Sequence, residues 1–267
     1  MPRLEAIHRD ASCIINALDS GLDLLLRVDA ELTAGDRRLI AAFAAEHQIP
    51  RIAWGLKDGV VEIAAQLSPV RIALSGVAVP PPPGGFLQAT PDGEAAIIAA
   101  VLAGLPDKLK PRDRIIELHA GCGTLTFALA RRAHVIAYEG DGVAVTALQK
   151  GASDAGLHGP VMAHKRDLMR QPLLPTEFKD AAVVVLDPPF GGALPQIEAI
   201  AASTITRVIY VSCNPQALAR DAAVLHRAGF ALVSAAPVDQ FLWSSRLESV
   251  SVYTRAAPPR ARARPPR

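Results

Sequence analysis

Cysteine is scarce in this chain of 267 residues, which contains three copies, Cys13, Cys122 and Cys213. They lie far apart and form no CxxC pair, so the sequence indicates neither a zinc site nor a disulfide framework. Free thiols suit a reducing compartment. We therefore expect a cytoplasmic protein without a bound metal.

Long apolar runs are also missing. The longest, Ala95–Leu105, falls short of the about 20 residues that a membrane-spanning helix needs. The first ten residues, MPRLEAIHRD, contain no apolar stretch of the kind found in signal peptides. These two absences lead us to expect no association with a membrane.

A strong excess of one charge is missing as well, since the formal net charge is +2. The exception is the segment from Arg255 to Arg267, which contains five arginines and no acidic residue. Together with its prolines, this composition predicts a disordered basic tail over residues 256–267 that is attracted to phosphate backbones. A merely solvated terminal run accounts for the same composition equally well.

Four consecutive prolines, Pro80–Pro83, followed by two glycines, divide the chain, because no helix or central strand can run through them. Before this break the pattern is mixed and predicts a small α+β lobe over residues 1–85, which we expect to face the substrate. Its expected elements are a helix over Thr33–His47, with Thr33 as N-cap, and strands over Leu22–Val28, Arg51–Trp54, Val60–Ile63 and Val70–Leu74.

After the break, over residues 86–255, apolar runs of strand length alternate with helical patterns. Expected strands are Arg114–His119, His134–Glu139, Pro160–Ala163, Ala181–Leu186, Arg207–Ser212 and Phe230–Ser234; expected helices are Asp92–Leu105, Thr124–Arg132, Gly142–Ala155, Leu194–Ala202 and Gln216–Ala228. This alternation predicts an α/β fold, a doubly wound Rossmann-like sheet covered on both faces. A seventh strand, Glu248–Tyr253, follows without a helix, so we expect it to pair antiparallel at that edge. Seven strands with this ending resemble the sheet of S-adenosylmethionine-dependent methyltransferases.

A glycine-rich loop follows the first of these strands, in the segment Glu117–Gly123. Ligands of doubly wound sheets bind at the carboxyl ends of the strands. Gly121 and Gly123 allow the backbone to approach a ligand closely. Since the spacing is not GxGxxG, we expect an adenosine ligand smaller than a dinucleotide. A tight turn without any ligand is the alternative.

Two acidic residues strengthen the case for a cofactor pocket. Glu139 ends the second strand, where a carboxylate can accept hydrogen bonds from both ribose hydroxyls. Asp167 follows the third strand and is expected to meet the adenine amino group. The loop and the two acids together predict a site for S-adenosyl-L-methionine.

The next two strands end in residues suited to chemistry. The fourth ends in Asp187-Pro188-Pro189-Phe190, and the fifth is followed by Cys213. A thiol at a helix N-terminus can have a lowered pKa, which raises its thiolate fraction. A small buried hydrophobe is the alternative for Cys213, and it is what most free cysteines are.

The segment from Val208 to Asp221, VIYVSCNPQALARD, resembles the catalytic motif of the RNA (uracil-5-)-methyltransferase family. Members of that family make 5-methyluridine in tRNA or 23S rRNA. Val238–Phe241, Leu247–Val250 and Phe86–Gln88 are similar to further motifs of the same family. The likeness covers about Phe86 to Arg255.

The resemblance implies an RNA substrate and a role for each matching residue. Cys213 would add to C6 of uracil, so that C5 becomes nucleophilic enough to accept a methyl group. Glu248 would then remove the C5 proton as a general base. The cofactor contacts implied by the resemblance are Gln88, His119, Thr124, Glu139 and Asp187.

The sequence departs from the family in four ways. Many members have an N-terminal β-barrel that binds RNA, for which this chain has no room, and many bind an iron–sulfur cluster through four cysteines. Only Cys13 precedes the catalytic region here, so we expect no cluster. The family usually has an aromatic residue in place of His119 and arginine in place of Phe190.

The change at Phe190 opens an alternative function. The sequence DPPF is typical of enzymes that methylate exocyclic amino groups, where the aromatic ring stacks on the base. On either interpretation Pro188, Pro189 and Phe190 are expected to contact the substrate. We therefore keep three hypotheses: a uridine C5 methyltransferase, an amino-methyltransferase acting on guanine or adenine, and a degenerate methyltransferase fold that only binds RNA.

Overall fold

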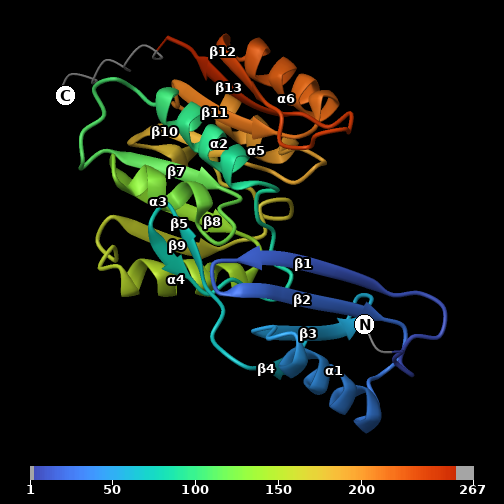
Figure 1. Ribbon diagram of the computed structural model, residues 1–267. Coiled ribbons are helices and arrows are strands. Elements are labelled where there is room, and N and C mark those ends of the chain that lie inside the picture. Colours follow the sequence, from blue (N-terminus) through green and yellow to red (C-terminus); the bar gives the residue numbers. More distant parts are fainter. Residues whose placement is uncertain (1–2, 257–267) are drawn as a thin grey trace, which may run out of the picture. The chain divides into compact units, whose positions relative to one another are not determined.

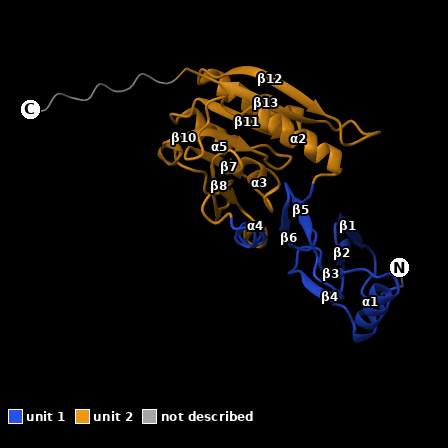
Figure 2. Cartoon of the chain, turned by 60° about the vertical axis from the view of Figure 1, so that its left-hand side comes forward, with its two compact units in different colours: residues 1–87, 146–156 blue, residues 88–145, 157–267 orange. Residues whose placement is uncertain are grey.

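The computed structural model in Figure 1 describes residues 3–256. The chain forms two compact units (Figure 2): one contains the residues up to 87 together with 146–156, the other 88–145 together with the residues from 157 onward. Each unit is described separately below. No helix within residues 3–256 is long and apolar enough to cross a membrane.

The smaller unit is built on a four-stranded sheet with one complete helix and a short hairpin. Its strands lie in the order β1 (Ser12–Leu18), β2 (Gly21–Val28), β3 (Arg51–Leu56) and β4 (Glu62–Gln66), with α1 (Ala34–Glu46) and the hairpin β5 (Ile72–Leu74) and β6 (Val77–Val79). The β2–β3 pair is parallel and the others are antiparallel. The sequence patterns missed β1 and β6, and the predicted strand at β4 begins two residues too early and ends three residues too early.

Two polar contacts explain local features of the smaller unit. The Thr33 hydroxyl accepts a hydrogen bond from the Asp36 backbone N–H, and the Asp36 carboxylate accepts one from the Thr33 N–H, so Thr33 is the N-cap of α1 as predicted. The buried Arg51 guanidinium pairs with Asp23 at 2.7 Å and also donates to the Pro81 carbonyl at 2.9 Å. This second bond fixes the proline run to the sheet.

The larger unit contains a seven-stranded sheet. Its strands lie in the order β12 (Ala231–Val238), β13 (Glu248–Thr254), β11 (Arg207–Ser212), β10 (Ala181–Leu186), β7 (Arg114–Leu118), β8 (His134–Glu139) and β9 (Val161–Lys165). Its helices are α2 (Pro91–Ala103), α3 (Thr124–Ala130), α5 (Leu194–Ala201) and α6 (Pro215–Arg227), with a 3₁₀ turn at Pro175–Phe178. Helix α4 (Gly142–Asp154) begins in this unit, and its residues from 146 onward belong to the smaller unit. The predicted α/β, doubly wound fold is confirmed.

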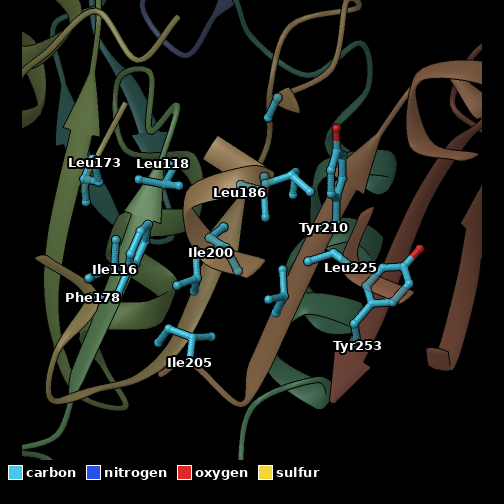
Figure 3. Close-up of a cluster of buried hydrophobic side chains, with 14 of the residues drawn as sticks. Ile116, Leu118, Leu173, Phe178, Leu186, Ile200, Ile205, Tyr210, Leu225 and Tyr253 are labelled. Atoms are coloured by element: carbon cyan, nitrogen blue, oxygen red, sulfur yellow. The ribbon is translucent and has the colours of Figure 1, made fainter. Parts of the chain in front are cut away.

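Burial explains why the sheet forms as it does. The β10 side chains from Val183 to Leu186 are completely buried, as expected for a central strand covered on both faces. Figure 3 shows part of this core, where Ile116 and Leu186 of the sheet meet Ile200 of α5 and Leu225 of α6. The carboxyl ends of the parallel strands therefore form one rigid edge.

Two predictions about the end of the chain need correction. Strand β13 is antiparallel, as expected, but it lies between β11 and β12 and is not the edge strand. Arg255 does not belong to a solvated tail, because its guanidinium lies over the Phe230 ring and donates to four backbone carbonyls. These carbonyls belong to residues at or just after the C-terminal ends of α5 and α6, so Arg255 fixes the two helix ends. The rest of the predicted tail, from residue 257, lies outside the described residues.

Candidate active site

One edge of the large sheet brings together the ends of five strands. The carboxyl ends of β7, β8, β10 and β11 carry Glu117, Glu139, Asp187 and Cys213, and β13 begins at the same edge with Glu248. Parallel strands in register guarantee this grouping, because their carboxyl ends lie side by side. Residues far apart in the sequence thus share one site.

The loop after β7 has a constrained backbone. His119, Gly121 and Gly123 all have positive φ values, of 62°, 55° and 106°. A left-handed conformation is unfavourable for a residue with a side chain, so His119 stores strain at this site. Glu139 holds the loop in place, because its carboxylate accepts hydrogen bonds from the Gly121 N–H at 2.9 Å and the Asp141 N–H at 2.8 Å.

The two glycines of this loop face different surroundings. A Cβ built on Gly123 would lie 2.5 Å from the ring of Phe127, so this glycine is required by packing at the start of α3. A Cβ built on Gly121 would meet no atom of the described residues within 4 Å. Gly121 therefore borders open space that a ligand can approach.

Two buried polar groups beside the loop lack partners. The Glu117 side chain is 1% exposed, and among the described residues nothing pairs with its Oε2. Burial, together with the charges of Asp187 and Glu139, raises the pKa of Glu117 to about 8. His119 Nε2 is also unpaired within residues 3–256, and burial lowers the pKa of this imidazole. Buried polar groups without partners are costly, and a ligand can satisfy them.

The remaining residues expected to contact the cofactor differ in their surroundings. Thr124 is half-buried as the first residue of α3. Asp167 is exposed, and its carboxylate accepts from the Met169 and Arg170 N–H groups, so it caps its own turn. Gln88 lies at the other end of the site, where its side chain donates to Asp187 at 3.5 Å.

These features fit an adenosine cofactor that carries a sulfonium group. The Glu117 oxygen and the His119 nitrogen are unsatisfied, the Gly121 backbone borders open space, and Glu139 supplies a carboxylate at the end of β8. Residues 3–256 contain no group of three His, Cys, Asp or Glu side chains that could hold a metal ion.

Cys213 and Glu248 are brought together by strand register. Ser212, the last residue of β11, pairs with Ser249, so Cys213 and Glu248 follow this last pair at the same edge of the sheet, where the Glu248 carboxylate acts electrostatically on the thiol. Cys213 is partly buried, and Glu248 is 4% exposed with its Oε2 unpaired among the described residues. A thiol and an acid from two separate sequence motifs thus become neighbours.

The prediction of a lowered pKa for Cys213 is wrong. Burial raises the pKa of this thiol, and the neighbouring carboxylates of Glu248 and Asp187 raise it further, whereas Arg246 lowers it. Asn214 is the N-cap of α6, so Cys213 stands one residue outside the helix, where the dipole is weaker. Burial also raises the pKa of Glu248, and burial together with Glu248 raises that of Asp187 to about 7.

Helix α6 holds the Asp187–Phe190 loop against the site. The Asn214 side chain donates to the Phe190 carbonyl at 2.9 Å, and Arg220 donates to the Gly191 carbonyl at 2.9 Å. The fully buried Asp221 accepts from the Ala193 N–H at 2.8 Å. Pro188 is buried, whereas Pro189 is exposed and the Phe190 side chain is 54% exposed. The loop is therefore fixed at its base and open at its tip.

Sequence reasoning gave no role to four residues that shape this site. Arg220 and Asp221 hold the loop, Gln240 donates to the side-chain amide oxygen of Gln88 at 2.7 Å, and Arg246 lies over the Phe190 ring at 5.4 Å from its centroid. The first three fall within motifs that carried the family resemblance, which was a usable signal. Arg246 lies between motifs, and nothing in the sequence alone pointed to it.

Comparisons with known proteins show which families this chain resembles. The family model described as "Conserved hypothetical protein 95" matches residues 103–218. An uncharacterized RNA methyltransferase of Caulobacter vibrioides is 40% identical over 240 residues, which cover 88% of this chain and 56% of that protein. The 23S rRNA (uracil(1939)-C(5))-methyltransferase RlmD of Chromohalobacter salexigens is 34% identical, covering 96% of this chain and 54% of that protein. This chain spans just over half the length of these relatives.

Among solved structures, the chain resembles the tRNA (uracil-54, C5)-methyltransferase of Pyrococcus abyssi in complex with S-adenosyl-L-homocysteine, with a TM-score of 0.70. The match covers 91% of this chain and 58% of that one at 16% identity, so it concerns the fold alone. The resemblance found in the sequence is confirmed: the chain is homologous to proteins named RNA methyltransferases, and it has the fold of S-adenosylmethionine-dependent methyltransferases.

Proposed function

We propose that this chain is the catalytic part of an S-adenosylmethionine-dependent RNA methyltransferase that modifies C5 of a uridine in rRNA or tRNA. The observation that carries the proposal is the proximity of Cys213 and Glu248, which follow the Ser212–Ser249 pair and interact electrostatically, at the edge where Asp187 follows β10. The names of the relatives support it, because one of them is a 23S rRNA uracil-C5 methyltransferase.

The cofactor side of the proposal assigns a role to each residue near the glycine loop. Bound S-adenosylmethionine supplies an electrophilic methyl group. Glu139 binds the ribose hydroxyls, with its carboxylate already oriented by the Gly121 and Asp141 N–H groups. Glu117 and His119 offer the cofactor their unpaired polar atoms, and Asp167 binds the adenine amino group. Gln88, Gly123, Thr124 and Asp187 complete the binding site.

The reaction side assigns the chemistry to Cys213 and Glu248. The thiol loses its proton to water and the thiolate adds to C6 of uracil, so that the electrons of the C5–C6 double bond make C5 nucleophilic. C5 would then bond to the methyl carbon that S-adenosylmethionine supplies, while the bond from that carbon to the sulfonium sulfur breaks and leaves S-adenosylhomocysteine. Glu248 takes the proton from C5, the double bond re-forms and the bond from C6 to sulfur breaks. The raised pKa of Cys213 means that the resting protein holds a thiol.

The base must leave its stack to reach a thiol at the sheet edge. Pro188, Pro189 and Phe190 are suited to receive it, since the loop that carries them is fixed by α6 but exposed at Phe190. The partner on this proposal is an RNA with an accessible uridine. A cytoplasmic location follows from the substrate.

The test is methyl transfer from labelled S-adenosylmethionine to total RNA, followed by nucleoside analysis. We expect label in 5-methyluridine, with loss of label for Cys213→Ala. Asp154→Ala, at an exposed carboxylate outside the site, is the control and should retain activity. Label in another nucleoside, or full activity in Cys213→Ala, would contradict the proposal.

The exposed ring of Phe190 after Asp187-Pro-Pro favours a second candidate, methylation of an exocyclic amino group on guanine or adenine. In that reaction the amino nitrogen itself is the nucleophile and none is needed from the protein, so it would survive Cys213→Ala and place the label in an N-methylated purine. Absence of transfer to any RNA would instead indicate a fold that binds RNA without catalysis. The same nucleoside analysis separates all three functions.

A further inference from the structure

The loop between β12 and β13, residues 239–247, has buried ends and an exposed middle. Gln240 is 5% exposed at one end and Glu248 is 4% exposed at the other. Between them the Leu242 side chain is 69% exposed and the Trp243 side chain is fully exposed. The loop is thus anchored inside the site at both ends while it presents large apolar groups to solvent.

The conformation of Trp243 is unusual in two respects. Its φ is 67°, a left-handed value that costs about 1 kcal/mol or more for a residue with a side chain. Its indole gains nothing from burial, although tryptophan is among the side chains that gain most from it. We expect a strained and exposed aromatic side chain beside a site when that side chain contacts a ligand.

Arg246 links this loop to the rest of the site. Its guanidinium lies over the Phe190 ring at 5.4 Å from the centroid, a cation–π contact between the two exposed loops. Arg246 also lowers the pKa of the Cys213 thiol, whereas the carboxylates of Glu248 and Asp187 raise it. A negatively charged chain that approaches Cys213 therefore meets acidic groups inside the site and Arg246 at its rim.

We propose that Trp243 and Arg246 bind the nucleotides that flank the target uridine, Trp243 by stacking on a base and Arg246 by pairing with a phosphate. An exposed aromatic next to an arginine is the combination with which proteins bind single-stranded RNA. The position of Arg246 supports RNA as the ligand, because Arg246 stands two residues before Glu248. Without this cation, the carboxylates of the site would repel the phosphate backbone of the RNA. The inference rests on the proposed RNA substrate but does not require that C5 be the methylated atom.

The chain offers a direct optical test, because it contains two tryptophans. Trp54 is 3% exposed and belongs to the smaller unit, whereas Trp243 is fully exposed. Titration with single-stranded oligouridine should quench the fluorescence of the wild-type protein, and the quenching should disappear in Trp243→Phe. Quenching that persists in Trp243→Phe would overturn the inference.

Affinity supplies the second readout. Trp243→Ala should bind the oligonucleotide about 5- to 150-fold more weakly than wild type, the range for loss of one stacked base. Arg246→Gln should reduce the slope of log K against log salt by about 0.7, as expected for one phosphate contact on a single strand. Leu232→Ala, at an exposed apolar side chain of β12, is the matched control and should bind like wild type.

The outcomes keep this inference separate from the proposed function. If Trp243→Ala binds RNA within about twofold of wild type, well below the loss expected for a stacked base, the loop is not an RNA contact, whatever the methylated atom is. If the wild-type protein is a dimer and Trp243→Ala is a monomer with unchanged RNA affinity, the loop is an interface between copies and the inference fails. Quenching with no 5-methyluridine formed would uphold the loop contact and reject uridine C5 as the target.

Discussion

Replacement of Asp221 should both destabilise the larger unit and release the Asp187–Phe190 loop. The carboxylate is fully buried and accepts four hydrogen bonds: from the Ala193 N–H at 2.8 Å, the Tyr210 hydroxyl at 2.8 Å, and two Arg220 nitrogens at 2.9 and 2.7 Å. Asp221→Ala would leave the first two donors without an acceptor in a site closed to water. Tyr210 lies within the core, as Figure 3 shows, so its hydroxyl has no easy access to solvent.

The magnitude follows from these contacts. Loss of one partner from a buried charged network costs about 3–5 kcal/mol, and each hydrogen bond to a charged acceptor contributes about 1.5–3 kcal/mol. The Arg220 side chain is 47% exposed, so solvent compensates for most of the free energy lost with its two hydrogen bonds to Asp221. We therefore expect Asp221→Ala to lower the free energy of unfolding by about 3 kcal/mol, and Tyr210→Phe, which removes one donor, by about 1–2 kcal/mol.

Urea unfolding followed by circular dichroism measures the stability change, and hydrogen exchange at the Ala193 amide reports the release of the loop. The double variant of Tyr210 and Asp221 should lose less than the sum of the single losses, because both remove the same bond. Asp154→Ala, at an exposed carboxylate paired with Lys150, should change stability by less than about 0.5 kcal/mol. A loss below about 1 kcal/mol for Asp221→Ala, with unchanged exchange at Ala193, would refute the reasoning.

Three further predictions concern the site itself. The pKa of Glu117 is raised, mainly by burial, from 4.5 to about 8, so its contribution to stability is full below pH 4.5 and is lost as the pH rises towards 8. Glu117→Gln should therefore become more stable relative to wild type as the pH rises between those values. A difference in unfolding free energy that does not change with pH would contradict this. Gly123→Ala should lower the free energy of unfolding by well over about 1 kcal/mol, because of the positive φ and the nearby Phe127 ring. Gly121→Ala should lower it by about 1–2 kcal/mol and should mainly weaken S-adenosylmethionine binding, which calorimetry measures. Equal effects of the two substitutions on stability and on binding would argue against open space at Gly121. Glu248→Gln should trap a methylated Cys213–uridine adduct on ordinary RNA, because the C5 proton is not removed. A shift in gel mobility under denaturing conditions would reveal this adduct. Normal turnover without any adduct would exclude Glu248 as the base.

The strands of the large sheet could be predicted from the sequence wherever burial is two-sided. Strands β10 and β11 were predicted with the observed bounds, because a short, continuous apolar run flanked by polar residues is typical of a strand covered on both faces. Strand β12 was predicted to end at Ser234 but continues to Val238, since pairing with β13 stabilises a stretch whose own pattern is weak. Strand β1 was missed because most of its side chains are exposed, so it has no apolar alternation.

The site could be predicted as a set of residues but not as an electrostatic environment. Glu139 ends a strand, Asp187 and Cys213 follow strands, and Glu117 is the next-to-last residue of one. Because the carboxyl ends of parallel strands meet at one edge of the sheet, such positions lie close together. The sign of the pKa shift at Cys213 could not be predicted, because it depends on burial and on Glu248, which lies far along the chain and is adjacent only through the pairing of β11 with β13. The contact of Arg246 with Phe190 is invisible in the sequence for the same reason.

The central claim is that Cys213 attacks C6 of a uracil base beside the methyl donor. The most direct measurement is incubation with S-adenosylmethionine and RNA that contains 5-fluorouridine, because fluorine at C5 cannot be removed as a proton and the covalent adduct accumulates. We expect a protein–RNA complex that survives denaturation, formed by the wild-type protein and absent in Cys213→Ala. Transfer of methyl groups to RNA by the wild-type protein, without any such complex, would contradict the claim.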